Sequence, residues 1–133
     1  MLKLEIVTPE RKVVEIETDS VTVPTASGEA GILTNHAPLI SALKPGILTY
    51  SGKGGAEKLA MSSGFVEVGS DQVSVLTDIA ESADEVNAEQ ARADREEAER
   101  ELAANSTDAA DENDSIRERV DLANARLSLA AGR

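Results

Sequence analysis

The composition of the chain changes abruptly near residue 81. All four prolines, eight of the nine glycines and every lysine fall within residues 1–80. Residues 81–133 hold 13 alanines, 15 acidic side chains and seven basic ones, all of them arginine. Glycine and proline favour turns between short strands, whereas alanine favours helix. Because 133 residues are too few for two full cores, the sequence predicts one core-forming domain at 1–81 and a helical appendage at 82–133.

Alternating apolar and polar residues predict several short strands in the first part. Successive side chains of a strand point to opposite faces, so a period of two places the apolar residues on one face. This period is found at Leu2–Ile6, Val14–Ile16, Val21–Val23 and Val73–Val75. Turn-forming segments such as Pro24–Gly28 separate the strands about every ten residues, which is typical of an all-β sandwich or flattened barrel. Aromatic residues make up only 2% of the chain, so we expect an aliphatic core.

The second part predicts two antiparallel helices joined by a short loop, which makes the overall class α+β. Ser82 followed by Glu85 has the pattern of a capping box, so we expect the first helix to begin there. The segment Asn105–Asp108 should end it, and a second helix should start at about Asp111. Apolar seams stepping by three and four residues support both helices; they comprise Ala88, Ala91, Arg95, Ala98 and Leu102, then Ile116, Val120, Ala123, Leu127 and Ala130.

The seam of the first helix is mostly alanine. Burying a methyl group in place of a leucine side chain forgoes roughly 2 kcal/mol per position. The hairpin is therefore weakly held. Two interpretations stay open: an element that detaches and docks elsewhere, or a permanently folded structural hairpin.

Composition and charge exclude several functions. The chain has no cysteine, hence no disulfide, thiol nucleophile or thiolate zinc site. Its formal net charge of −12 repels nucleic acid phosphates and anionic lipids. The sequence shows no long apolar run and no signal-peptide pattern. We therefore expect a soluble protein that binds other proteins, with no nucleic acid partner and no membrane contact of its own.

Catalytic motifs are missing from the sequence. The one histidine, His36, lies in the segment Gly31–Leu39, which reads as a loop bounded by glycine and proline. Ser63 lacks the Gly-x-Ser-x-Gly pattern of a nucleophile elbow, and no phosphate-binding loop is present. We expect no catalytic residue, no metal site, no bound cofactor and no enzymatic activity.

Three stretches together resemble the epsilon subunit of rotary ATP synthases. Residues 28–46 carry Gly-x-x-Gly-Ile-Leu, then His-Ala-Pro, then Leu-x-Pro-Gly. Ser63–Val68 is similar to the family's Gly-Gly-Phe-x-Glu-Val strand, with Ser63 in place of the first glycine, and Val73–Glu81 is similar to its last strand. The start, Leu4–Glu10, also fits the pattern. In the hairpin the resemblance depends on length, alanine content and Ala125–Leu127.

The resemblance implies a function that composition could not supply. Members of this family are non-catalytic subunits of the central stalk. Their sandwich binds the gamma subunit and the membrane-embedded ring of c subunits. Their hairpin is a mobile brake that folds against the sandwich or extends toward the catalytic alpha and beta subunits and blocks ATP hydrolysis. The chain should then contact a membrane only through the complex, on the cytoplasmic face of a bacterial plasma membrane or the stromal side of a plastid thylakoid.

The resemblance also implies contact residues. It assigns Glu29 and His36 to the contact with the rotor ring; the alternative is that His36 only hydrogen-bonds its own turn. It makes Arg117, Arg119 and Arg126 candidates to meet an acidic segment of the beta subunit. The alternative there is that Arg117 and Arg119 only balance Glu118 and Asp121 on a solvated face.

The chain departs from the pattern through which some bacterial members bind ATP. An aspartate and an arginine of that pattern are replaced by Asn87 and Gln90, and an arginine of the second helix is replaced by Leu122. Arg126 is retained. Because charge-assisted hydrogen bonds contribute about 1.5 to 3 kcal/mol each, we expect ATP to bind weakly or not at all.

Two readings from other classes compete with the resemblance. A generic adaptor that recruits an unrelated partner through the hairpin would show no preference for gamma. A small hydrolase using His36 with a carboxylate would lose turnover in His36→Ala.

Overall fold

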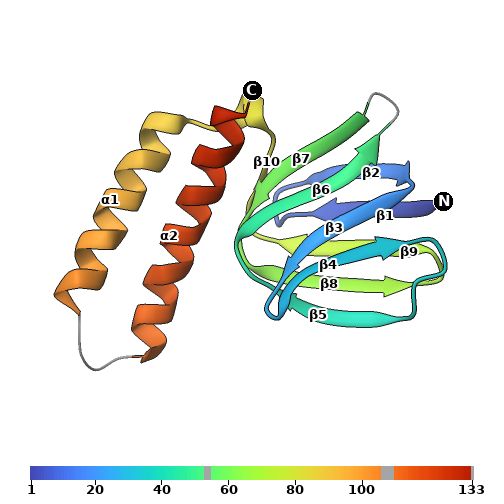
Figure 1. Ribbon diagram of the computed structural model, residues 1–133, viewed down its shortest axis with the longest axis horizontal. Coiled ribbons are helices and arrows are strands. Elements are labelled where there is room, and N and C mark those ends of the chain that lie inside the picture. The colour runs from blue at the N-terminus through green and yellow to red at the C-terminus, as the bar shows by residue number, and fades with distance from the viewer. Residues whose placement is uncertain (53–54, 106–109, 133) are drawn as a thin grey trace.

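The computed structural model describes residues 1–52, 55–105 and 110–132, and it consists of a β-sandwich followed by two antiparallel helices (Figure 1). This confirms the predicted α+β class. The strands are β1 (Leu2–Val7), β2 (Lys12–Thr18), β3 (Ser20–Thr25), β4 (Gly28–Leu33), β5 (Leu39–Leu43), β6 (Gly46–Gly52), β7 (Gly55–Met61), β8 (Gly64–Gly69), β9 (Gln72–Thr77) and β10 (Ala80–Glu81). They are followed by the short 3-10 helix η1 (Ala83–Glu85) and the helices α1 (Ala88–Ala104) and α2 (Ala110–Ala131).

The strands form one sheet that folds over itself into a nearly closed barrel. Its order is β10-β7-β6-β3-β5-β8-β9-β1-β2, with β4 paired to β3 outside this path. All ladders are antiparallel except that between β1 and β9. Thr18 at the end of β2 hydrogen-bonds the carbonyl of Ser51 on β6, and the Ser51 hydroxyl accepts from the backbone N–H of Ser20 at 3.2 Å. These bonds draw the β2 edge toward β6.

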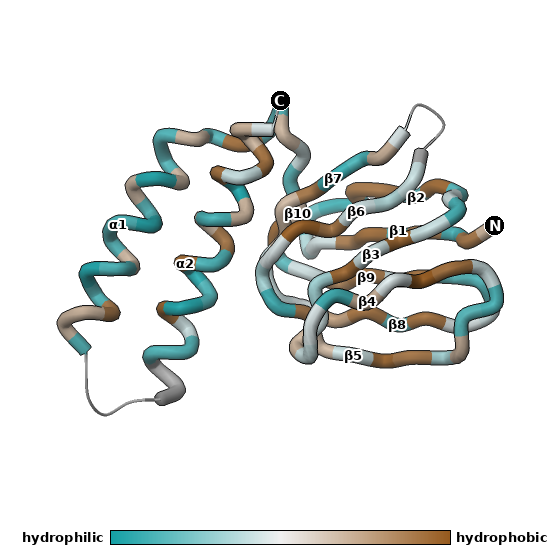
Figure 2. Tube along the Cα trace, in the orientation of Figure 1, coloured by the Kyte–Doolittle hydropathy of each residue, from teal (hydrophilic) through white to brown (hydrophobic). Residues whose placement is uncertain are grey.

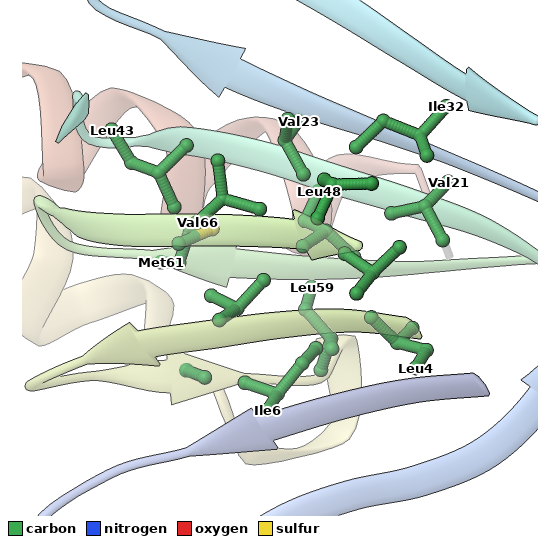
Figure 3. Close-up of a cluster of buried hydrophobic side chains, with 14 of the residues drawn as sticks. Leu4, Ile6, Val21, Val23, Ile32, Leu43, Leu48, Leu59, Met61 and Val66 are labelled. Carbon is green, nitrogen blue, oxygen red and sulfur yellow. The ribbon is translucent and has the colours of Figure 1, made fainter. Parts of the chain in front are cut away.

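The core between the two layers is aliphatic, as composition predicts (Figure 3). Inward-facing residues alternate along β1, β3, β8 and β9 because the side chains of a strand alternate between faces. Tyr50 is only partly buried against the core, and Phe65 points outward. The largest fully buried apolar side chains are those of Leu2, Leu4, Ile6, Ile32, Leu48, Met61, Val21, Val23, Val66, Val73 and Val75.

Two turn assignments made from the sequence were wrong. Gly31–Leu33, read as the start of a loop, belongs to β4, and Pro24 with Thr25, read as a turn, ends β3. Pro24 cannot donate a ladder bond, and its carbonyl accepts the backbone N–H of Lys44 at 2.9 Å. The tight turn itself is confined to the residues between β3 and β4.

The first helix begins later than the capping box predicted. Ser82 and Glu85 do pair, since the backbone N–H of Ser82 donates to Glu85 Oε1 at 3.1 Å, but they close only the single turn η1. The helix α1 starts after Asn87, whose side-chain Oδ1 accepts the backbone N–H of Gln90 at 3.0 Å. It ends at Ala104 with Asn105 as the C-cap, and the rest of the expected break, residues 106–109, lies outside the described residues.

The hairpin docks on the sandwich through α2, which lies between α1 and the strands (Figure 1). Ala91 and Ala98 of α1 are buried, as are Ile116 and Ala123 of α2, which confirms those seam positions. A second buried cluster joins Ala60 of β7 to α2, and its α2 members are Ala125 and Leu129. The sequence contains a second row of apolar residues on α2, because Leu122, Ala125 and Leu129 are spaced by three and four residues. Only the first apolar face of α2 was predicted.

Candidate interaction surfaces

An apolar row crosses the outer face of the sandwich. Ala42, Phe65, Leu76 and Val7 are successive cross-strand neighbours on β5, β8, β9 and β1. Phe65 is 60% exposed although large aromatic side chains favour burial. Ile40 lies two residues before Ala42 on the same face and is also exposed. We call these five residues the outer apolar patch.

The outer apolar patch has an acidic rim. Glu67 pairs across the strands with Ile40. Glu5 precedes Val7 by two residues on the same face of β1, where it lies 3.6 Å from Lys12 Nζ. An open groove of about 660 Å³ runs beside Phe65 and Leu76 and reaches Glu118 of α2. In Figure 2 hydrophobic segments follow β8 and β9, while α1 is largely hydrophilic. A contiguous apolar surface with a polar rim is typical of a protein-binding site.

The two predicted rotor-ring residues lie at opposite ends of β4. Glu29 is exposed and pairs with Pro24 near the start of the strand, where it lines a groove shared with Leu129 of α2. His36 follows the other end, and its backbone N–H donates to the Leu33 carbonyl at 3.1 Å. The four residue-to-residue steps of the strand from Glu29 to Leu33 span roughly 13 Å. The structure therefore does not bring Glu29 and His36 together.

The loop that carries His36 is tied to the turn between β8 and β9. The backbone N–H of Asn35 donates to Asp71 Oδ1 at 2.7 Å, and Asn35, Ser70 and Asp71 all have positive φ angles. The His36 Nδ1 atom lies 2.6 Å from the Ala37 carbonyl oxygen, so the tautomer protonated at Nδ1 donates within its own turn. This is the bond that the structural alternative for His36 anticipates.

Each arginine predicted to meet the beta subunit has a carboxylate partner within this chain. The Arg117 guanidinium is 3.3 Å from Asp114, and that of Arg119 is 2.6 Å from Glu101 of α1. These partners differ from Glu118 and Asp121, which the solvated-face alternative named. Both arginines are nevertheless largely exposed.

Arg126 is far less exposed than the other two arginines. Its Nε donates to Oε1 of Glu81 on β10 at 2.6 Å, and its Nη1 lies 3.8 Å from Oδ2 of Asp94 on α1. The side chain of Arg126 is 18% exposed and that of Glu81 25%. Sequence reasoning could not find this partner because Glu81 is 45 residues away along the chain.

A second ion pair joins the sandwich to η1. Arg11, in the β1–β2 loop, lies 2.9 Å from Glu85 Oε2. The pKa of the Glu85 carboxyl is lowered chiefly by the hydrogen bond from the Ser82 backbone; burial opposes this shift, and the Ser82 hydroxyl and Arg11 lower the pKa by smaller amounts. Because both side chains of this pair are about half exposed, solvent weakens their attraction.

The positions that depart from the ATP-binding pattern have structural roles here. Asn87 caps α1, and the Gln90 side chain donates to Asp94 Oδ1 at 2.8 Å. Leu122, Asp94 and Arg126 line a cavity of about 270 Å³ between the helices. That volume is below the usual range of small-molecule sites.

Residues 1–52, 55–105 and 110–132 contain no group of three or more histidine or acidic side chains placed to hold a metal ion. Within the same residues, neither helix combines the length and the apolar character that a membrane span requires.

Comparisons with known proteins single out one family. Residues 1–83 match the model of the ATP synthase delta/epsilon chain β-sandwich domain. The ATP synthase epsilon chain of Desulfitobacterium hafniense (strain Y51) is 40% identical over 126 residues, which cover 95% of this chain and 86% of that protein. The ATP synthase epsilon chain of Moorella thermoacetica is 48% identical over 102 residues, 76% of each chain.

Solved structures agree on the fold. A chain in the mitochondrial ATP synthase of Euglena gracilis, a structure of OSCP, F1 and c-ring, superposes with a TM-score of 0.78 at 22% identity, covering 98% of this chain and 81% of that one. A chain in the central stalk and c-ring of the Tetrahymena thermophila enzyme gives a TM-score of 0.61 at 12% identity, covering 98% and 94%. At such identities the similarity establishes the arrangement of sandwich and helices alone.

Proposed function

Since this chain belongs to the ATP synthase epsilon family, we propose that its hairpin inhibits ATP hydrolysis by leaving the sandwich and extending toward the catalytic alpha and beta subunits. Family membership makes the chain a non-catalytic subunit of the rotary central stalk and a peripheral part of a membrane complex. The proposal concerns what its two parts do within that complex.

The small contact between hairpin and sandwich is the observation that carries the proposal. Where the two parts meet, the buried residues are Ala125 and Leu129 of α2 and Ala60 of β7, and Ile47, Ala83 and Val86 pack against them partly buried. Fully burying a leucine side chain contributes about 1.5 to 3 kcal/mol, and an alanine methyl group less. A contact of this size can be replaced by a comparable contact on a neighbouring subunit. The hairpin can therefore leave the sandwich while α1 and α2 stay paired.

The sandwich is the part that we propose holds the chain in the stalk. The outer apolar patch offers the gamma subunit an apolar surface, and its acidic rim favours basic side chains on the partner. The patch belongs to strands whose inner faces form the core, so it stays in place when the hairpin moves.

Substituting Phe65 tests this docking surface. Phe65→Asp introduces a charge at the centre of the patch and should weaken binding to the gamma subunit at least about tenfold, since central aromatic residues dominate interfaces. Gln72→Asp, at an exposed position of β9, is the matched control. Equal gamma affinity of both variants in a calorimetric titration would remove the outer apolar patch from the proposed interface.

Glu29 and His36 remain proposed contacts with the polar loops of the ring of c subunits. Because they lie at opposite ends of β4, one ring surface would have to extend along the whole strand to reach both. Cross-linking from each position separately distinguishes the two. We likewise propose that Arg117 and Arg119 exchange their partners within the chain for an acidic segment of the beta subunit when the hairpin extends.

Deletion of residues 83–133 tests the inhibitory role. The truncated subunit should assemble with the purified catalytic head complex as the full chain does, and ATP hydrolysis should rise several-fold because the brake is gone. The measurement is steady-state hydrolysis over a range of ATP concentrations. Unchanged hydrolysis with normal assembly would contradict inhibition by this hairpin. For the site of action we propose the cytoplasmic face of a bacterial plasma membrane.

A further inference from the structure

Three elements that are far apart in the sequence meet at the Arg126 guanidinium. Arg126 belongs to α2, Glu81 to the last strand of the sandwich and Asp94 to α1. The Arg126 Nε to Glu81 Oε1 distance is 2.6 Å, and Arg126 Nη1 lies 3.8 Å from Asp94 Oδ2. Of these two Arg126 contacts, the one to Glu81 joins the hairpin to the sandwich. The bond to Asp94 stays within the hairpin.

The acidic side chain on α1 is itself positioned by its neighbours. Gln90 donates to Asp94 Oδ1 at 2.8 Å, and the Gln90 backbone N–H is held by the capping side chain of Asn87 at 3.0 Å. Asn87 and Gln90 occupy the two positions at which the family's nucleotide-binding pattern has charged side chains. In this chain they orient Asp94 instead, so the cation at Arg126 is balanced by carboxylates of the protein.

We propose that Glu81, Arg126 and Asp94 form an ionic latch, whose opening sets the fraction of molecules with a released hairpin. The inference rests on the proposed function, because it describes how that same hairpin is held. Arg126 is mostly buried in the docked hairpin, so removing the Glu81 charge would leave a partly desolvated cation with one distant partner and would weaken docking. The apolar contact at Ala125 and Leu129 is small and insensitive to charge.

The other ion pair between the two parts contributes less. Arg11 and Glu85 are about half exposed, and exposed pairs contribute little to stability. The latch pair is more buried, so its strength decides the docking equilibrium. Salt screens partly exposed pairs incompletely, and high ionic strength should therefore favour release without completing it.

The central test substitutes the sandwich side of the latch. Glu81→Gln keeps the shape of the side chain and removes its charge, and it should raise the released population at least about fivefold, the equivalent of roughly 1 kcal/mol. Glu101→Gln is the matched control. It breaks the Arg119–Glu101 pair, also 2.6 Å long, which lies wholly within the hairpin and should leave docking unchanged.

The absence of cysteine from the sequence allows the population to be measured with spin labels in the full-length subunit. Nitroxides on cysteines introduced at Ala104 of α1 and Lys58 of β7, both exposed, report the distance between hairpin and sandwich by pulsed electron paramagnetic resonance. We expect one distance in the parent and an added, longer distance in Glu81→Gln. If that variant does not fold, Arg126→Gln is measured in its place, with an increase of similar size expected because it removes the other side of the same pair.

A double-mutant cycle with Arg126→Gln completes the test. If the latch exists, the variant that combines Glu81→Gln with Arg126→Gln releases the hairpin no more than either single variant. Additive effects of the two substitutions, or equal distance distributions for Glu81→Gln and Glu101→Gln, would overturn the proposal. These measurements involve no ATP hydrolysis. Failure of the latch therefore leaves the inhibitory role to be judged by the deletion of residues 83–133 alone.

Discussion

Gly64 is a position at which the sandwich has no room for a side chain. A Cβ atom added there would lie 2.0 Å from the carbonyl oxygen of Leu76, so β8 and β9 could not keep their present separation. The oxygen belongs to the backbone and cannot turn away as a side chain can. Gly64 also immediately precedes Phe65, and a shift of this strand would displace the outer apolar patch.

Replacing Gly64 by alanine should therefore destabilise the sandwich. We expect Gly64→Ala to lower the free energy of unfolding by about 3 kcal/mol, as overpacking does when the backbone must move. Gly69→Ala on the same strand is the control, because a Cβ there meets nothing within 4 Å. Urea unfolding followed by circular dichroism measures both. Similar midpoints for the two variants would contradict the close approach of the strands.

Single-residue roles were predicted from the sequence only where neighbours along the chain create them. The alternation around Leu4 and Val75 predicted their burial correctly because a strand fixes the direction of each side chain. The partnership of Arg126 with Glu81 depends on how the hairpin docks, which no local pattern encodes. The alternation of side chains along a strand implied that Phe65 and Val66 face opposite sides of β8. It did not imply that no other element of the chain covers the side on which Phe65 lies.

Among the elements, the sandwich and the hairpin differ in how they are stabilised. The large aliphatic side chains of the main core all come from the strands, whereas α1 buries only two alanines. Burial of apolar area scales with side-chain size, so the strands supply most of the hydrophobic stabilisation. The family match ends at residue 83, close to the end of β10.

Truncation after Ser82 tests the division into residues 1–81 and 82–133. The fragment should unfold in one cooperative transition with a β-type circular dichroism spectrum, and it should retain binding to gamma. Loss of Ala125 and Leu129 exposes Ala60 alone among the buried residues of that cluster, so the decrease in stability should be only about 1 to 2 kcal/mol. A molten or insoluble fragment would show that the sandwich depends on the hairpin.

The ionic latch also makes ATP binding to the hairpin less favourable. Arg126 is engaged by Glu81 and Asp94, and the acidic excess of residues 81–133 makes the local potential unfavourable for a nucleotide. Titration of the isolated subunit with ATP at physiological salt should show no saturable binding below about the millimolar range, weaker than roughly −4 kcal/mol. A micromolar dissociation constant by calorimetry would mean that Arg92 or Arg95 contacts the phosphates.

The boundaries of the elements show where sequence patterns are insufficient. The strand β4 was read in part as loop because Ile32 is its only buried residue and glycines interrupt it. The start of α1 was placed too early because a capping box also closes a single turn, as at η1. In both cases the local sequence pattern is present in the structure. The bounds of β4 depend on its pairing with β3, and the start of α1 depends on the geometry of the linker that precedes it.

The whole molecule combines a sandwich with a large aliphatic core and a helical hairpin held to it by few contacts. The core and the nearly closed sheet keep the outer apolar patch in one shape. The hairpin is attached through the cluster around Ala125 and Leu129, through the latch and more weakly through the exposed Arg11–Glu85 pair, and these contacts can be exchanged for contacts elsewhere. A subunit built in this way can remain bound to the stalk while its hairpin changes position.

The most direct test is the position of the hairpin in the assembled enzyme, determined by cryo-electron microscopy with and without ATP. The account predicts that the outer apolar patch is covered by gamma in both states. Without ATP at least one population should have the hairpin away from Ala60, extended toward the catalytic subunits. A hairpin that stays docked on β6 and β7 in every rotational state, under both conditions, would contradict the account.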